Sequence, residues 1–162
     1  MEKATFGAGC FWGVEHFFAE VPGVADAVSG YEGGHAASPT YRQVCSGTTD
    51  HAEVVEVTFD PAKVSYAKLV ELFFKMHDPT TMNRQGPDVG TQYRSAIFVH
   101  SPEQERVARE ELEKAKGRYP RPIVTSIEPA QTFWKAEDYH QDYFEKNQGH
   151  SCHVTYKELE SQ

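Results

Sequence analysis

The chain has 162 residues and a formal net charge of −8 at pH 7. This length favours a single domain that buries about 68–70% of its unfolded surface, and the negative charge argues against a general attraction to nucleic acid or anionic membranes. No apolar run approaches a membrane span, and the first residues lack the basic and apolar regions of a signal peptide. We therefore expect a soluble, cytoplasmic, monomeric protein without nucleic-acid or membrane partners.

Apolar periodicity divides the chain into alternating strands and helices. β-Branched or small-residue runs predict strands, and apolar residues three and four apart predict helices. Long polar loops that interrupt such a pattern are usually functional or mobile. In chain order we expect a strand at 4–8, a helix from Phe11 to Pro22, a strand at 24–31, a loop at 30–41, a strand at 54–59, a helix at 66–76, a loop at 77–94, a strand at 96–100, a helix from Ser101 to about Gly117, a strand at 123–127, a weaker helix at 134–147 and an extended tail from 148.

The stretch Gly-Cys-Phe-Trp-Gly at residues 9–13 joins the first predicted strand to the first predicted helix. Cys10 falls at or just before the start of that helix, where free N–H groups and the positive end of the helix dipole favour an anion. A thiol so placed ionises more easily, and the thiolate is the reactive form. The flanking glycines permit a tight turn. A small buried cysteine is the alternative interpretation, but the neighbouring glycines and aromatics favour a nucleophile.

Five sequence blocks appear in a fixed order. The blocks are Gly-Cys-Phe-Trp-Gly at 9–13, Gly-Tyr-x-Gly-Gly at 30–34, Tyr-x-x-Val-Cys-Ser-Gly at 41–47, His-Ala-Glu-Val at 51–54 and Asn-Arg-Gln-Gly-x-Asp-x-Gly-x-Gln-Tyr-Arg-Ser at 83–95. In these blocks the chain resembles the A-type peptide methionine sulfoxide reductases, from about Phe6 to Cys152. With the alternation of strands and helices, this predicts one α+β reductase domain over residues 1–162, a two-layer sandwich with a mixed, ferredoxin-like sheet and an irregular C-terminal tail.

The resemblance implies reduction of methionine S-sulfoxide, free or in proteins, to methionine. Cys10 matches the nucleophile that attacks the sulfoxide sulfur, and Glu53 matches the acid. Oxygen leaves poorly as a bare oxide, so the reaction needs a proton donor. A carboxyl beside an apolar, aromatic-lined pocket has its pKa raised by desolvation and can keep that proton. The alternative for Glu53 is an ordinary surface acid beside the edge of the 54–59 strand.

Five further residues match the family's substrate pocket. Phe11 and Trp12 match the walls that receive the S-methyl group; burying one methyl is worth only about 0.8 kcal/mol, so the walls select shape more than they supply affinity. Tyr41, Asp88 and Tyr93 match the polar residues around the sulfoxide oxygen and the substrate backbone, where hydroxyls can bind developing charge. Taken separately, each of these three is also typical of a loop-capping Asp or a half-buried Tyr.

The resemblance implies that Cys152 resolves the sulfenic acid left on Cys10. Cys152 lies in the predicted mobile tail, residues 148–162, where relatives often carry Gly-Tyr-Cys-Gly and this chain reads Gly-His-Ser-Cys-His at 149–153. The implied disulfide is Cys10–Cys152, reduced by external thioredoxin through thiol–disulfide exchange, with no cofactor and no metal. Cys45 matches a position that the family often fills with cysteine, and we interpret it as structural.

Three other classes of protein remain open on the residues alone. A cysteine hydrolase would use Cys10 with a histidine base and consume no reductant. A metal-binding module would use ligands near the C-terminus and carry stoichiometric metal. A redox sensor would switch between Cys10 and Cys152 without turnover. The histidine candidates for the base are His35, His51 and His77, and those for the metal module are His140, His150 and His153 with Cys152.

Overall fold

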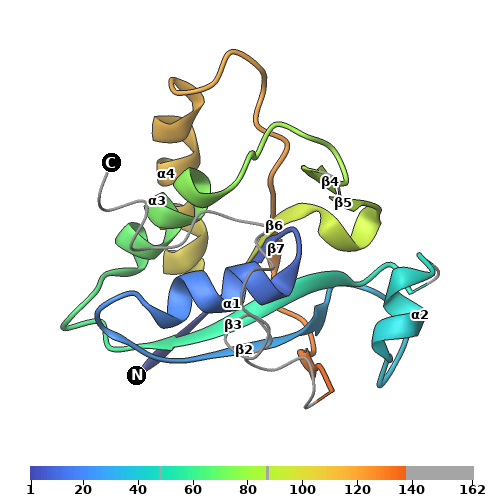
Figure 1. The fold of residues 1–162 in the computed structure, drawn as a ribbon. Coiled ribbons are helices and arrows are strands. Elements are labelled where there is room, and N and C mark those ends of the chain that lie inside the picture. The colour runs from blue at the N-terminus through green and yellow to red at the C-terminus, as the bar shows by residue number, and fades with distance from the viewer. Residues whose placement is uncertain (48, 87, 138–162) are drawn as a thin grey trace.

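A computed structural model describes residues 1–47, 49–86 and 88–137 of the chain. Within them a six-stranded sheet carries its long helices on one face (Figure 1). A small two-stranded hairpin stands apart from this sheet. The elements are β1 (Glu2–Ala8), α1 (Phe11–Ala19), β2 (Val24–Glu32), α2 (Tyr41–Cys45), β3 (Ala52–Phe59), α3 (Tyr66–Met76), β4 (Arg84–Gln85), β5 (Asp88–Val89), the 3₁₀ turn η1 (Thr91–Tyr93), β6 (Ser95–Val99), α4 (Pro102–Lys116), β7 (Ser126–Pro129) and β8 (Trp134–Lys135).

The strand order in the large sheet is β7-β6-β1-β3-β2-β8. Every neighbouring pair is antiparallel except β6 and β7, which are parallel, so the sheet is mixed. α1 connects β1 to β2, and α3 lies in the connection from β3 to β6. The predicted α+β class and mixed sheet are confirmed, whereas the ferredoxin-like label stays a prediction.

The two faces of the sheet are packed differently, because side chains alternate along each strand. The helix-facing positions form the main core, which includes Phe6 of β1. The Phe6 ring stacks on Phe18 of α1 at 4.9 Å and on Phe73 of α3 at 5.3 Å between centroids. Phe6 therefore packs both helices against β1. Its truncation to alanine would lower the free energy of unfolding by about 3–5 kcal/mol. The opposite face carries a small cluster of Ala52, Val54, Ala96 and Phe98 that is covered by Phe133.

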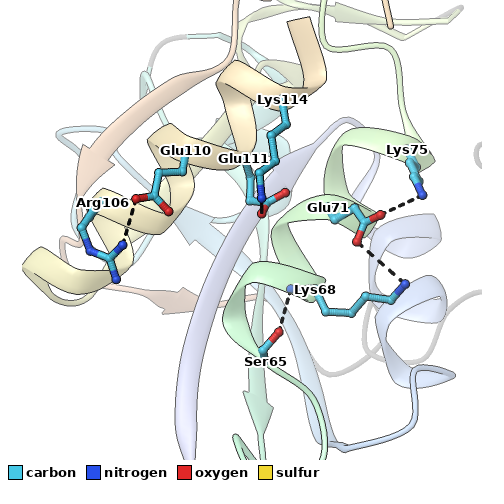
Figure 2. A network of polar contacts seen from close by, with 8 residues as sticks. All are labelled: Ser65, Lys68, Glu71, Lys75, Arg106, Glu110, Glu111 and Lys114. Carbon is cyan, nitrogen blue, oxygen red and sulfur yellow. Dashed lines mark hydrogen bonds and ion pairs between the residues drawn. The ribbon is translucent and has the colours of Figure 1, made fainter. Parts of the chain in front are cut away.

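The outer sides of α3 and α4 carry exposed ion pairs along each helix (Figure 2). Glu71 pairs with Lys75 at 2.9 Å, and Arg106 pairs with Glu110 at 2.9 Å. Pairs four residues apart on a helix each contribute about 0.2–0.5 kcal/mol. This surface therefore supports the helices weakly. Among the helices of the described ranges, none combines the length and the apolar character that crossing a bilayer would take.

Three predicted elements differ from the structure by three residues or more. α1 ends at Ala19, before the predicted end at Pro22, because Glu20 N–H and Val21 N–H bond to the carbonyls of Phe17 and Phe18, three residues back, and close the last turn. β7 begins at Ser126, three residues after the predicted start, because the backbone before it bonds elsewhere: Val124 N–H donates to Pro79 O at 2.8 Å. The predicted helix from Trp134 is wrong at its start, because Trp134 pairs with Tyr31 on the edge of β2 and forms β8. An open sheet edge offers unpaired backbone groups that outweigh a weak helical pattern. The rest of that helix and the predicted tail lie outside the described residues.

Short regular structure that the sequence analysis missed lies directly after the first predicted long loop and inside the second. α2 lies in the connection after β2, and its first turn is held by a capping box in which Thr40 and Gln43 bond each other's backbone N–H groups. The β4–β5 hairpin and η1 lie in the second loop. Figure 1 shows these elements toward the same end of the sheet as the start of α1.

Candidate active site

Cys10 occupies the N-cap position of α1, as predicted. Gly9 precedes it with φ of 97°, a left-handed conformation that turns the chain from β1 into the helix and favours glycine. The Cys10 side chain makes no capping hydrogen bond to α1 and is 6% exposed. The sulfur therefore lies at the positive end of the helix dipole, where a thiolate is stabilised.

Glu53 reaches this helix start from the neighbouring strand β3. Its Oε1 accepts a hydrogen bond from Phe11 N–H at 3.2 Å, and the residue is only 1% exposed. The interpretation of Glu53 as a surface acid is therefore wrong. The bond brings a buried carboxyl next to the residue that follows Cys10, although the two partners are 42 positions apart in sequence.

Aromatic rings form one wall beside Cys10. The Phe11 ring lies 6.1 Å from Trp12 and 6.1 Å from Tyr41, and Trp12 stacks on Tyr41 at 5.9 Å. The Phe11 ring also lies 5.7 Å from the ring of Tyr31 of β2. Phe11 and Tyr31 are fully buried, whereas Trp12 and Tyr41 are half-buried and form the rim. The arrangement provides apolar surface with a phenol at its edge.

Tyr41 joins this wall to α2. Burial, and next the charge of Glu53, raises the pKa of Tyr41, whose hydroxyl donates a hydrogen bond to the Cys45 thiol. Cys45 is an exposed residue, but partial desolvation of its thiol beside Tyr41 raises the thiol pKa, an effect opposed by the bond from Tyr41 and reinforced by the charges of Glu53 and Glu137. A raised thiol pKa leaves less thiolate, so Cys45 is less reactive than an ordinary cysteine.

Asp88 and Tyr93 come from the loop between α3 and β6. Asp88 pairs with Gln85 in the β4–β5 hairpin, and Tyr93 ends η1. Burial raises the pKa of Tyr93, and the charges of Glu53, Cys45, Asp88 and Cys10 raise it further, in that order. Tyr93 therefore stays protonated at neutral pH as a hydrogen-bond donor, within electrostatic range of Cys10, Glu53 and Asp88.

Seven of the eight predicted site residues thus lie together at one end of the sheet. Cys152, the eighth, lies outside the described residues. The sequence analysis missed Tyr31, which stood in the quoted block at 30–34, and Glu137, whose Oε1 accepts Tyr41 N–H at 3.0 Å. No sequence signal links Tyr41 to a residue 96 positions away.

The histidines proposed for a hydrolase are engaged in other contacts. His35 lies 3.2 Å from Asp50 at an exposed site. Both ring nitrogens of His51 and of His77 bond to other groups, so neither ring offers a lone pair to a thiol proton in this arrangement. Across residues 1–137 without 48 and 87, no group of three or more His, Cys, Asp or Glu side chains could hold a metal. The ligands of the metal-module hypothesis lie outside that part of the chain.

Known proteins resemble the chain over nearly its whole length. Residues 2–162 match the protein family described as "Peptide methionine sulfoxide reductase". A peptide methionine sulfoxide reductase MsrA from Geobacter sulfurreducens is 63% identical over 154 residues, or 94% of this chain and 95% of that protein. The reduced form of Mxr1 from Saccharomyces cerevisiae has 39% identity and a TM-score of 0.89, covering 93% of this chain and 88% of that one. Mxr1 in complex with Trx2 has 26% identity and a TM-score of 0.66, covering 95% and 88%.

Proposed function

The chain belongs to the peptide methionine sulfoxide reductase family and is a peptide-methionine (S)-S-oxide reductase, and from this premise we propose how its own residues carry out the reduction. Cys10 is the nucleophile, Glu53 the proton donor and Cys152 the resolving thiol. The substrates are methionine S-sulfoxide residues in proteins and the free amino acid. The whole chain acts as one domain, and residues 148–162 bring Cys152 to Cys10.

In the first step the Cys10 thiolate attacks the sulfoxide sulfur. A bond forms between the two sulfur atoms while the S–O bond, protonated by Glu53, breaks and releases its oxygen as water. That water then attacks the Cys10 sulfur, the bond between the two sulfur atoms breaks, and the products are methionine and a Cys10 sulfenic acid. Two electrons pass from the Cys10 sulfur, which is oxidised, to the sulfoxide sulfur, which is reduced. Burial of Glu53 at 1% exposure disfavours a bare carboxylate, which suits a group that has to hold and then donate a proton.

Substrate binding uses the wall described above. The rim of Trp12 and Tyr41 with the buried Phe11 receives the S-methyl group, and its asymmetric shape favours one sulfoxide epimer. The hydroxyl of Tyr93 donates a hydrogen bond to the sulfoxide oxygen as its charge grows, and the hydroxyl of Tyr41 does so after exchanging its bond to the Cys45 thiol for the substrate. Asp88 orients substrate or a neighbouring group from the hairpin.

In the second step the Cys152 thiol condenses with the sulfenic acid, which releases water and forms a Cys10–Cys152 disulfide. A thioredoxin dithiol then exchanges with this disulfide and restores both thiols. The complex of yeast Mxr1 with Trx2 supports thioredoxin as the reductant. No cofactor takes part, because cysteine sulfur carries both electrons.

The observation that carries the proposal is the hydrogen bond from Phe11 N–H to Glu53 at the start of α1. This bond places a buried carboxyl at the helix terminus that stabilises the Cys10 thiolate. The side chain of the same residue, Phe11, stacks on Tyr41 in the aromatic wall. A hydrolase would need a histidine base at Cys10 instead.

A single-turnover reaction tests the proposal. Fully reduced protein is mixed with S-form methionine sulfoxide and no reductant, and the cysteines are mapped by mass spectrometry. We expect one equivalent of methionine and a new Cys10–Cys152 bond. Methionine with a different bond would overturn the role of Cys152, and no methionine from folded protein would overturn the reduction itself.

The matched variant is Cys152→Ser. It should still yield about one equivalent of methionine, because attack and proton transfer precede resolution, but it should not recycle with thioredoxin. The control is Cys45→Ser, which should turn over with thioredoxin like the parent. Full thioredoxin-linked turnover by Cys152→Ser would contradict the resolving role.

A further inference from the structure

His51 lies in the connection between β2 and β3, the same connection that carries Tyr41. His51 is buried, with 2% of its surface exposed. Its Nδ1 lies 2.9 Å from Gly34 N, and its Nε2 lies 2.6 Å from Ala36 O. Nearby, His35 N–H donates to Thr49 O at 2.9 Å. The ring therefore ties the outgoing part of the connection to its returning part, one residue before β3 begins.

The two partners of His51 fix its proton. A backbone N–H can only donate, so Nδ1 accepts from Gly34; a backbone carbonyl can only accept, so Nε2 carries the hydrogen. His51 is thus a neutral imidazole that satisfies one donor and one acceptor of the loop. The packing is tight as well, since a Cβ on Gly34 would lie 2.2 Å from Thr49 O and 2.4 Å from His51 N.

His77 has a similar place in the other loop of the site. It follows α3, is 8% exposed, and its Nδ1 lies 2.6 Å from Phe73 O. Its Nε2 lies 2.8 Å from Ser95 Oγ, and that hydroxyl lies 2.7 Å from Thr125 Oγ1. Since Phe73 O can only accept, Nδ1 carries the hydrogen and Nε2 accepts from Ser95. His77 and Ser95 are the two ends of the segment that carries Asp88 and Tyr93.

We propose that His51 and His77 are positioning residues of the sulfoxide-reducing site. Each ring holds in place, through its two hydrogen bonds, one loop that carries a tyrosine of the site. His51 acts through Tyr41, and His77 acts through Tyr93. Neither ring takes part in the chemistry. Both loops are anchored at strand ends next to the reacting groups: β3 carries Glu53 two residues after His51, and Ser95 pairs with Ala8, two residues before Cys10.

The proposal rests on the proposed function. The sulfoxide reductase activity of the parent protein is therefore measured together with that of each variant. His51→Phe keeps a flat ring but leaves Gly34 N–H and Ala36 O without their partner. We expect kcat/KM for sulfoxide reduction to fall about ten- to a hundred-fold, the scale of a misplacement of about 1 Å, with the loss mainly in kcat. Alkylation of Cys10, mapped by mass spectrometry, should keep the parent's rate.

His51→Asn is the rescuing variant. Its amide oxygen takes the position of Nδ1 and accepts from Gly34 N–H, whereas the shorter side chain does not reach the place from which Nε2 donates to Ala36 O. Asn should therefore recover part of the activity that Phe loses. If Asn and Phe fall equally although both fold with the parent's circular dichroism, the hydrogen bonds of His51 do not position the loop and the proposal is overturned.

Double-mutant cycles decide which tyrosine each histidine serves. If His51 acts through Tyr41, then His51→Phe should cost little in a Tyr41→Phe background, whereas its loss should add to that of Tyr93→Phe. His77→Phe should show the reverse pattern. Additive losses in all four pairings would reduce both histidines to general packing residues. An inactive parent would refute the proposed function instead, so the two failures are distinguishable.

Discussion

The starts of α1 and α4 are built in opposite ways. At α4 the N-cap residue is Ser101, whose hydroxyl accepts Gln104 N–H at 3.1 Å, and two acids stand in the first turn. At α1 the N-cap is Cys10, its side chain makes no capping bond, and the first turn holds no acid. The acceptor for Phe11 N–H comes instead from Glu53 of β3. The acceptor at the start of α4 is a residue next to the helix in sequence, whereas the acceptor at the start of α1 comes from a strand that is distant in sequence.

This difference separates stability from chemistry. A local hydroxyl cap satisfies helix N–H groups at low cost and occupies the positive end of the helix. At α1 the Cys10 thiol occupies the N-cap position. The Glu53 carboxyl, which accepts the hydrogen bond from Phe11 N–H, is also the proposed proton donor. Substitutions at the α1 start should therefore change activity more than stability, and those at α4 should do the opposite.

Cys10→Ser should have the largest effect on activity. Loss of the nucleophile should lower sulfoxide reduction by about four orders of magnitude or more. Stability should be unchanged or higher by up to about 1 kcal/mol, because serine is a preferred N-cap. Urea unfolding and single-turnover assays on the same sample measure both; a strongly destabilised variant would show that the thiol is a packing residue.

Glu53→Gln should lower the rate of sulfoxide reduction about 10²- to 10⁴-fold, the usual contribution of a general acid. The amide oxygen still accepts Phe11 N–H, so the fold and the alkylation of Cys10 should persist. Glu53→Ala is the comparison, since it also leaves that N–H unsatisfied and should cost a further 1–3 kcal/mol or so of stability. A Gln variant as fast as the parent would exclude Glu53 as the proton donor.

Glu32 tests whether burial alone makes a carboxyl functional. It is fully buried, accepts Gln131 N–H at 3.0 Å, and belongs to the face of the sheet away from α1. Burial raises its pKa from 4.5 to about 7, opposed by the bond from Gln131 and reinforced by the charges of Glu56 and Glu128. Because the folded state binds this proton more tightly, stability should fall as pH rises from about 4.5 to about 7.

The matched change is Glu32→Gln, which keeps an acceptor for Gln131 and cannot titrate. Each pKa unit corresponds to about 1.4 kcal/mol, and solvent screening reduces the sum, so we expect the parent to lose about 1–2 kcal/mol relative to the variant between pH 5 and pH 8. Urea unfolding at several pH values measures this. Activity at neutral pH should match the parent; a loss like that of Glu53→Gln would break the distinction between the two carboxyls.

Ser101→Ala should cost about 1 kcal/mol of stability, the usual effect of losing an N-cap hydroxyl. Activity should be unchanged, because α4 carries no proposed site residue. Ser101→Thr retains the acceptor and should behave like the parent in a thermal melt. An activity loss in the Ala variant with a parent-like melt would mean that α4 contributes to the site.

Arg106→Ala should have the smallest effect, about 0.5 kcal/mol or less. The residue is 58% exposed and pairs with Glu110, which is 55% exposed, on the outer side of α4 (Figure 2). The difference from the parent should shrink further in high salt. A loss of several kcal/mol would show that this surface is part of a larger packed interface.

Much of the architecture could be predicted because its signals are local. The helix at 66–76 was predicted with the bounds that α3 has, since its apolar residues keep helical spacing and Ser65 caps it. The short elements α2 and β8 escaped prediction for different reasons. α2 spans five residues and shows only a capping box, whereas β8 exists because β2 offers it an edge. A strand of two residues has no periodicity to detect.

The position of Cys10 at a helix start was determined by the sequence itself, because a strand, a glycine and a helical run follow one another within a few residues. Only the tertiary structure decided that Glu53 accepts Phe11 N–H and that Glu137 accepts Tyr41 N–H. These contacts depend on strand register and on which segments meet at one end of the sheet. Register follows from packing summed over the whole core, and no single stretch of sequence records it.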